Sequence, residues 1–227
     1  MKPRIIHAHA PLPDGSTLEL HEHDGRFYLH SHGQQWAGTG NRVAEDELAK
    51  LATHPFRPAR QPKMLILGLG LGALARAVAT AIPQKKAEFT VYEPQREIAQ
   101  WQRKFFPEEN CFHDGRLKCI HDLTPSSLAR GNGSLHAILL QADACPLDQG
   151  KLLIDDKRWL GAMRDALQSG GVLGITAARI IPGMFSRLRR AGFDVVEHFV
   201  EIHPSAKKPR RFPIWLARKP AGSSQND

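Results

Sequence analysis

The sequence predicts an α/β protein whose main part is a doubly wound, mostly parallel sheet with an antiparallel last strand, preceded by a small N-terminal β-hairpin segment. From Lys63 onward, short apolar runs alternate with amphipathic helical segments, which is typical of doubly wound sheets. Before that point, two alternating runs flank Asp24-Gly25, a strong signal for a two-residue hairpin. Among 227 residues, 41% are hydrophobic and 24% are charged, which excludes wholesale disorder, collagen and coiled coil.

The chain is expected to divide into an N-terminal β-hairpin segment (residues 1–56), a Rossmann-like domain (residues 63–220) and a short tail (residues 221–227). A Pro-rich stretch at residues 54–62 marks the boundary between the first two. A length of about 150 residues per domain also favours one domain with a small appendage.

In the N-terminal segment, we expect strands at residues 17–23 and 26–32, a preceding strand that carries His7 and His9, and a helix at residues 44–52. Side chains alternate along a strand, so Leu18, Leu20, Phe27 and Leu29 share one face of the hairpin. The other face carries a group of histidines with one tyrosine: His21, His23, Tyr28, His30 and His32. This row lacks a closing fourth ligand of the kind that a zinc site needs, so we expect a polar, solvent-facing surface and no metal.

The second part of the chain alternates strand and helix. The expected strands cover residues 64–67, 89–92, 117–120, 137–140, 172–176, 195–202 and 212–217. The expected helices cover residues 71–82, 95–105, 155–168 and 184–190, and one more begins at Thr124-Pro125, a good N-cap and first-turn pair. The last two strands are close enough in sequence to pair antiparallel.

The net charge of +8 favours anionic partners and works against polycationic substrates. The one dense basic run, residues 207–211, is interpreted as a solvated loop, and no recognised nucleic-acid motif accompanies it. Three cysteines without a CxxC pair exclude a disulfide framework and fit a reducing, cytoplasmic setting. The longest apolar run, residues 64–75, is shorter than the ~20 residues of a membrane span, and no secretory signal is visible.

The strongest motif is a glycine-rich turn, Gly68, Gly70 and Gly72, directly after the first strand of the main part. Glu93 ends the next strand, where an acid can bond both ribose hydroxyls, and Asp122 ends the third, where it could meet an adenine amino group. Together these features indicate a nucleoside site. Two alternatives remain: both acids could cap the helices that follow them, or the turn could bind a dinucleotide, although its third glycine is misplaced for GxGxxG.

With these features, the chain resembles the spermidine synthase (polyamine aminopropyltransferase) family, which is built on the class I methyltransferase fold. The resemblance covers nearly the whole chain. The segments that carry it, besides the glycine turn and the helix before the Pro-rich stretch, are Gly33-Gln34-Gln35, Val91-Tyr92-Glu93, Ile120-His121-Asp122 and Ser169-Gly170-Gly171-Val172-Leu173.

The resemblance implies a bound adenosyl cofactor, S-adenosylmethionine or its decarboxylated form. It assigns the ribose to Glu93, the adenine side to Asp122 and the cofactor's tail to Gln35. The amine half of the site departs from the family. Leu71 stands where the family has the aspartate that holds the cofactor's amino end, and Gln141 stands where it has the proton-accepting aspartate.

Two further positions bear on the amine half. Ala44-Glu45 replaces a Tyr-Gln pair of the family, and Asp143 lies two residues beyond Gln141 and is the candidate to substitute for the missing acid. An alternative is that Asp143 and Glu45 together rebuild an acidic pocket from neighbouring positions. Polyamines need several carboxylates for binding and for proton removal, and an amide such as Gln141 cannot act as a general base. The catalytic candidates are therefore Asp143 and Gln141, with weak or absent transfer to putrescine.

The expected function is a spermidine-synthase-like transferase with an unknown small-molecule acceptor. The alternatives are a non-catalytic protein that binds an adenosine ligand and a methyltransferase that acts on a non-polyamine acceptor. A nucleic-acid methyltransferase has only the basic loop in its favour. No membrane partner is expected, and the N-terminal hairpin offers an edge for a homodimer.

Overall fold

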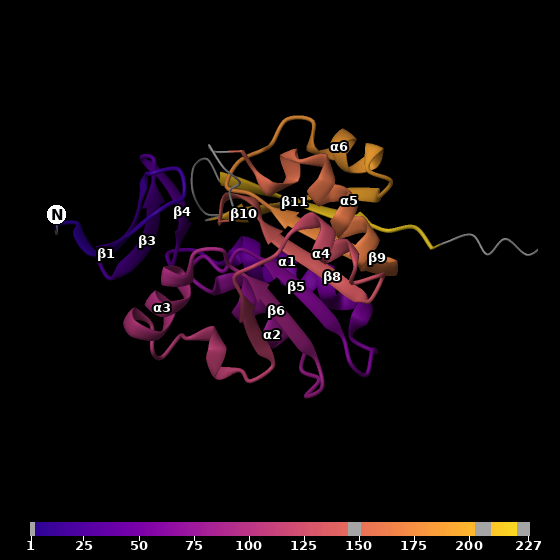
Figure 1. The fold of residues 1–227 in the computed structure, drawn as a ribbon, viewed down its shortest axis with the longest axis horizontal. Helices are drawn as coiled ribbons and strands as arrows, with labels where there is room; N and C mark the ends of the chain where they lie inside the picture. The colour runs from indigo at the N-terminus through magenta and orange to yellow at the C-terminus, as the bar shows by residue number, and fades with distance from the viewer. Residues whose placement is uncertain (1–2, 145–150, 203–209, 222–227) are drawn as a thin grey trace, which may run out of the picture.

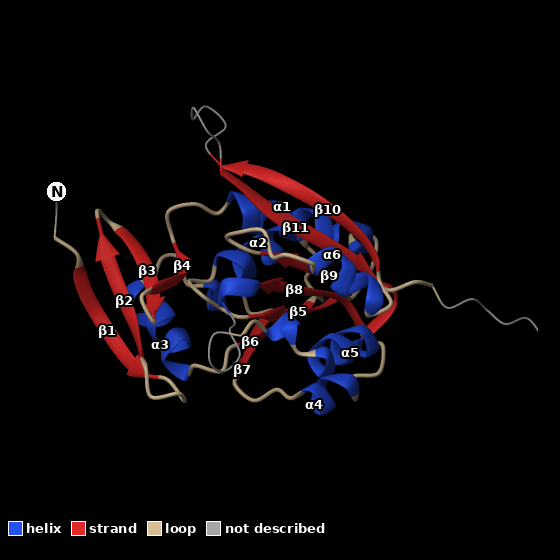
Figure 2. Ribbon diagram, turned by 90° about the horizontal axis from the view of Figure 1, so that it is seen from above, coloured by secondary structure: helices blue, strands red, loops and turns tan. Residues whose placement is uncertain are grey.

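The computed structural model describes residues 3–144, 151–202 and 210–221. It contains two sheets, a four-stranded one at the N-terminus and a seven-stranded one that forms the body of the molecule. The small sheet lies beside the end of the large sheet at which its parallel strands finish (Figures 1 and 2).

The small sheet is an antiparallel meander in the order β1-β2-β3-β4. Its strands are β1 (Ile5–Pro11), β2 (Thr17–His23), β3 (Arg26–Ser31) and β4 (Gln34–Gly38). The predicted Asp24-Gly25 turn is present, with φ angles of 50° and 70°. A second turn of the same kind, His32-Gly33 with φ angles of 52° and 68°, joins β3 to β4, so the predicted hairpin is extended on both sides.

One face of the small sheet is apolar as expected, because Leu18, Leu20 and Leu29 are buried. The expectation that the histidine face lies in solvent is wrong for His21. His21 is 6% exposed. Its ring stacks on His30 at 4.7 Å between centroids, and its Nε2 lies 2.6 Å from a Glu19 carboxylate oxygen. Among the described residues, no group of three or more His, Cys, Asp or Glu side chains is placed to hold a metal ion.

The large sheet has the strand order β10-β11-β9-β8-β5-β6-β7. Its strands are β5 (Lys63–Leu67), β6 (Glu88–Tyr92), β7 (Leu117–Ile120), β8 (Leu135–Gln141), β9 (Leu167–Thr176), β10 (Asp194–Ile202) and β11 (Arg210–Arg218). The strand β11 runs antiparallel to both of its neighbours, and the pairs from β9 to β7 are parallel. This arrangement confirms the predicted fold class.

Helices cover both faces of the large sheet. They are α1 (Val43–Thr53), α2 (Ala73–Ala81), α3 (Arg96–Phe105), α4 (Pro125–Ala129), α5 (Lys157–Ala166) and α6 (Met184–Arg190), with short 3-10 helices at η1 (His54–Phe56), η2 (Cys111–His113), η3 (Ala142–Ala144) and η5 (Leu153–Asp155). Side chains of β5 alternate between the two cores: Met64 and Ile66 pack with α1, α2 and α3, whereas Leu65 and Leu67 pack with α4, α5 and α6.

Helix α1 precedes the Pro-rich stretch, yet it lies on the large sheet. A Cβ atom on Gly174 of β9 would lie 2.8 Å from Leu48 Cδ1 and 2.9 Å from Ala52 Cβ. The absence of a side chain at Gly174 therefore brings α1 close to the sheet. This contact packs the middle and the last turn of α1 against β9.

One predicted element changes type. Residues 167 and 168 were expected to end a helix, but they begin β9, where Leu167 pairs with Leu135 of β8. The register between β8 and β9 shifts after that pair. Gly170 has a φ of +74°, and backbone bonds between the Gly170-Gly171 pair and Lys219 hold the irregular strand. None of the described helices has the length and apolar character required to cross a bilayer.

Candidate functional site

The glycine turn connects β5 to α2 at the carboxyl edge of the large sheet. Gly68, Gly70 and Gly72 have φ angles of +85°, +51° and +77°, a region that side-chain-bearing residues rarely adopt. A Cβ atom on Gly72 would also lie 3.0 Å from the Gln102 Oε1 of α3. The turn thus needs glycine both for its backbone conformation and for its close packing against α3.

Glu93 follows β6 and holds this turn in place. One of its carboxylate oxygens accepts a hydrogen bond from the Leu69 N–H at 3.0 Å, and the other accepts one from the Gln95 N–H at 3.0 Å. The side chain is buried, and burial raises the pKa of Glu93 to about 7, against the lowering effect of the Gln95, Leu69 and Gly70 N–H groups. Its bond to Gln95 does not cap α3, because Gln95 is the N-cap residue of that helix and, among the described residues, no side chain accepts from the N–H groups of its first turn.

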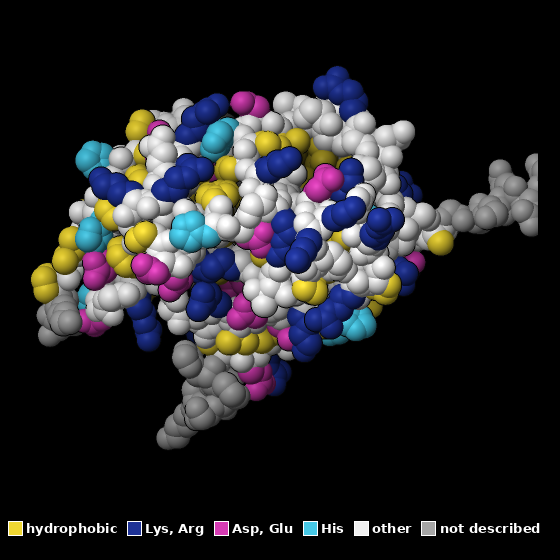
Figure 3. All heavy atoms as spheres, turned by 90° about the horizontal axis from the view of Figure 1, so that it is seen from below, with side chains coloured by type: hydrophobic (Ala, Val, Ile, Leu, Met, Phe, Trp, Pro, Cys, Tyr) yellow, Lys and Arg dark blue, Asp and Glu magenta, His cyan; other side chains and the backbone are white. Residues whose placement is uncertain are grey.

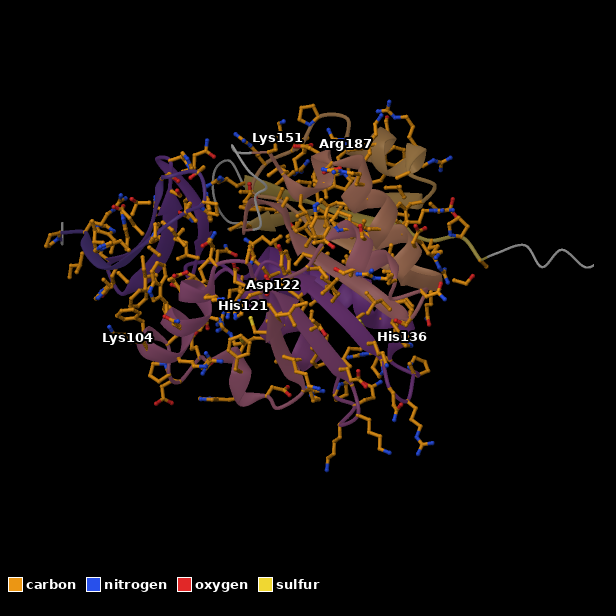
Figure 4. The ribbon with its side chains drawn as sticks, in the orientation of Figure 1. Lys104, His121, Asp122, His136, Lys151 and Arg187 are labelled. Carbon is orange, nitrogen blue, oxygen red and sulfur yellow. The ribbon has the colours of Figure 1, made fainter. Side chains whose placement is uncertain are left out.

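Asp122 follows β7, next to Glu93 at the same edge of the sheet, because the Glu93 N–H donates to the Ile120 carbonyl. The carboxylate of Asp122 is 97% exposed and lies 3.8 Å from the Arg96 guanidinium. It does not cap the helix that follows, since the Thr124 hydroxyl accepts the Ser127 N–H at the start of α4. Figure 4 shows His121 and Asp122 at the sheet end near the small sheet, and His136 at the opposite end.

A cavity of about 400 Å³ lies where the small sheet meets the ends of the large-sheet strands. It brings together Gln35 of β4, Gln141 of β8 and Asp143 of η3, three of the predicted site residues. The full lining is Arg26, Tyr28, Gln35, Trp36, Ala37, Gly38, Gly40, Asn41, Ala44, Glu45, Gln141, Asp143, Ala178, Ile202, Arg210 and Phe212. The glycine turn, Glu93 and Asp122 do not line it, so the predicted site residues form two neighbouring groups.

Glu45 lines this cavity together with Asp143, as the alternative of a rebuilt acidic pocket expects. It lies in the first turn of α1 and is 8% exposed. Burial raises the pKa of its carboxyl to about 6. A signal was present in the sequence, because Glu45 shares the apolar stripe of its helix with Leu48, Ala49 and Ala52. Acidic side chains are almost never buried at such a position unless they are paired with another group.

The other acid of the cavity, Asp143, is fixed by the backbone. Its carboxylate accepts a hydrogen bond from the Ala178 N–H at 2.6 Å, which ties the end of β8 to the loop after β9. Gln141 pairs with Thr176 in the β8–β9 ladder. Leu71, which takes the place of an acid in the family, is buried in the core and does not line the cavity.

A second hollow of about 620 Å³ lies over α1 and α2, and residues such as Arg42, Asp46, Arg57 and Arg76 line it. None of the predicted site residues reaches it. On the face drawn in Figure 3, Lys and Arg side chains are interspersed with Asp and Glu and form no single stripe. We therefore place the candidate chemistry at the cavity beside the glycine turn.

The sequence matches no protein-family model and no curated protein. The structure, in contrast, is similar to spermidine synthase from Thermotoga maritima, with a TM-score of 0.74, 16% identity, and coverage of 94% of this chain and 72% of that one. This is the spermidine synthase fold.

Two further similarities support that assignment. A probable spermidine synthase from Corynebacterium glutamicum matches with a TM-score of 0.61, 18% identity, and coverage of 96% of this chain and 81% of that one. A precorrin-6y C5,15-methyltransferase from Geobacter metallireducens matches with a TM-score of 0.56, 14% identity, and coverage of 78% of this chain and 87% of that one. The resemblance noted in the sequence is thus confirmed at the level of the fold.

Proposed function

We propose that this protein is a spermidine-synthase-like transferase that binds S-adenosylmethionine or its decarboxylated form beside the glycine turn and modifies an acceptor held in the 400 Å³ cavity. The observation that carries the proposal is the pair of carboxylates, Glu45 and Asp143, in one cavity at the carboxyl edge of this fold. In open α/β sheets, this edge is where ligands bind. One of the similar structures is a spermidine synthase in complex with the transition-state analogue AdoDATO, with a TM-score of 0.72.

Glu93 fits the role of a ribose ligand in its donor chemistry. A carboxylate offers about four acceptor sites. In Glu93, backbone hydrogen bonds from the N–H groups of Leu69, Gly70 and Gln95 use up to three of them. An acceptor site is left for a hydroxyl. Because the pKa of Glu93 is about 7, the ionised form that accepts such a bond most strongly dominates only above neutral pH.

Glu45 fits the role of proton acceptor for the acceptor molecule. A general base works best when its pKa lies close to the working pH, and burial brings the pKa of Glu45 to about 6. The ionised carboxylate can therefore bind an ammonium group at neutral pH and take its proton, which frees the nitrogen lone pair. An adenosyl sulfonium, when bound, supplies an electrophilic carbon and a neutral thioether leaving group.

Gln141 and Asp143 would orient the acceptor, and Gln35, which the resemblance assigns to the cofactor's tail, lines the same cavity. Amide groups both donate and accept hydrogen bonds, and Asp143 has a fixed position because of its bond to Ala178. The glycine turn itself offers no carboxylate for the cofactor's amino end, because Leu71 packs into the core. The turn thus does not select the decarboxylated cofactor by charge.

Product analysis tests this proposal. The protein is incubated with an amine acceptor mixture and with each cofactor in turn, and the adenosyl product is identified by mass spectrometry. Methylthioadenosine from the decarboxylated cofactor supports aminopropyl transfer. S-adenosylhomocysteine from S-adenosylmethionine supports the alternative, methyl transfer to a non-polyamine acceptor. Absence of both products, in a protein that binds methylthioadenosine, would leave only the non-catalytic alternative.

A further inference from the structure

The cavity is lined by charges of both signs. Two carboxylates, Glu45 and Asp143, and two guanidinium groups, Arg26 and Arg210, belong to its lining. They come from four separate elements: α1, η3, β3 and β11. A site for a molecule that carries only positive charges has no need of the two arginines, so their presence calls for a different ligand chemistry.

The carboxylate of Glu45 has no ion pair with any residue that the structure describes. Among the residues that the structure describes, no hydrogen bond or ion pair joins it to another side chain, and the lowering influences on its pKa are its own backbone N–H and the charge of Arg42. Yet only 8% of the surface of Glu45 is exposed to solvent. A carboxylate so placed, on the wall of a cavity, is ready to bind a cation that enters the cavity.

Neither arginine of the cavity forms an ion pair with a described residue. Arg26 lies against the backbone of Gly40, where a Cβ atom would be 3.3 Å from its Cδ. Arg210 places its guanidinium carbon 5.6 Å from the centroid of the Phe212 ring. The neighbour of Arg210 in β11 behaves differently, because Arg211 pairs with Glu201 at 2.8 Å.

The four charged residues of the cavity differ in their exposure to solvent. Arg26 and Arg210 are exposed, whereas Glu45 is buried and Asp143 is half-buried. The two arginines of the lining are thus the more solvent-exposed charges, and Glu45 is the least exposed of the four. A ligand that enters would bring a cationic end to the carboxylates and leave its other end beside the arginines.

From this arrangement we infer that the acceptor is a zwitterion, with an amine that reaches Glu45 and Asp143 and a carboxylate that binds Arg26 and Arg210. This inference rests on the proposed function and names the substrate class of the same cavity. Guanidinium groups bind carboxylates through paired, charge-assisted hydrogen bonds. A diamine of the same length would instead place its second ammonium beside two like charges, which disfavours binding.

The test compares two probes of equal carbon-chain length, 4-aminobutanoate and 1,4-diaminobutane. Each is titrated by calorimetry into the full chain that has first been saturated with methylthioadenosine. We expect 4-aminobutanoate to bind at least about 10-fold more tightly than the diamine, as loss of one charge-assisted contact would imply. Equal binding, tighter binding of the diamine, or no binding of 4-aminobutanoate would overturn the inference.

Variants locate the effect. Arg210→Gln and Arg26→Gln are expected to weaken 4-aminobutanoate by about 10-fold each and to leave the diamine unchanged or bound more tightly. Arg218→Gln is the matched control, since Arg218 ends the strand that Arg210 begins and does not line the cavity. If the two cavity variants bind 4-aminobutanoate with the same affinity as the control variant, the arginines do not bind its carboxylate and the inference is wrong.

The saturation step separates this inference from the function on which it rests. If methylthioadenosine does not bind, the proposed function fails, and the inference fails with it. If methylthioadenosine binds and the diamine is the preferred probe, the proposed function stands and only the zwitterion is excluded. The calorimetric signal of methylthioadenosine alone, recorded first, distinguishes the two results.

Discussion

Two buried carboxylates on either side of the sheet edge have different surroundings. Glu93 is 2% exposed and Glu45 is 8% exposed, and burial raises the pKa of each. The backbone N–H groups of Leu69 in the glycine turn and of Gln95 before α3 donate to the carboxylate of Glu93. Among the described residues, only its own backbone N–H is bonded to the carboxylate of Glu45. Glu93 is thus held by the backbone of a preformed turn, whereas the carboxylate of Glu45 has no such backbone partners from other residues among those described.

The largest effect is expected for Glu45→Gln. The amide keeps the shape but cannot accept a proton, and loss of a positioned general base typically removes ~10²–10⁴ of the rate. Single-turnover transfer to the best acceptor, measured for Glu45→Gln and for the matched control Glu47→Gln on the same helix, checks this. An equal rate in both variants would assign Glu45 a purely structural role.

The pH dependence of stability should reveal Glu93. Its pKa is raised from 4.5 to about 7, so between these values the native state holds a proton that the unfolded state has lost. The free energy of unfolding therefore falls as the pH rises through this window, by on the order of 3 kcal/mol, and the contribution is constant above it. Denaturant titrations of wild type and Glu93→Gln should show this fall in the difference between them.

The exposed acid of the same strand, Glu88, provides the control for that comparison. Glu88→Gln is expected to follow the wild type at every pH, because its carboxylate is 59% exposed and its ion pair with Lys63 is long, at 3.7 Å. A difference between wild type and Glu93→Gln that does not change with pH would mean that Glu93 is not a buried titrating group.

A smaller effect is expected in the pH profile of transfer. Because the pKa of Glu45 is about 6, protonation below that value removes the proton acceptor, and the rate should fall about 10-fold for each pH unit below it. The profile of kcat, measured with the acceptor at saturation, tests this. A rate that is flat from pH 5 to 8 would exclude Glu45 as the base.

The smallest effect is expected for Asp122→Asn. Its carboxylate is 97% exposed, so solvent screens it and an adenine contact would gain about 1 kcal/mol or less. We expect methylthioadenosine to bind less than about 10-fold more weakly, as measured by calorimetry. A loss greater than 100-fold would show that Asp122 moves onto the ligand.

The sequence predicted the fold well because the signals were local. The Asp24-Gly25 turn and the apolar run that forms β5 are both set by consecutive residues. The start of β9 was missed, because Leu167 is recruited by its pairing with Leu135, a contact between residues far apart in sequence.

The candidate site was predicted only in part, for the same reason. Gln35, Gln141 and Asp143 were named, and the cavity contains all three. That Glu93 bonds the turn, that Asp122 faces solvent and that Glu45 and two arginines join the cavity all depend on how separate elements pack. Of Glu45 and the two arginines, only Glu45 could be named from the sequence, as an acid that joins Asp143, and it lies on the apolar stripe of α1.

One titration tests the central claim most directly. Methylthioadenosine is titrated into wild type, Glu93→Ala and Glu45→Gln, with circular dichroism to confirm that each is folded. We predict saturable binding to wild type, a loss of about 10- to 100-fold in Glu93→Ala, since a charge-assisted bond contributes ~1.5–3 kcal/mol, and no change in Glu45→Gln. Absence of binding to wild type, or equal affinity in Glu93→Ala, would contradict the assignment of an adenosyl ligand to the glycine turn.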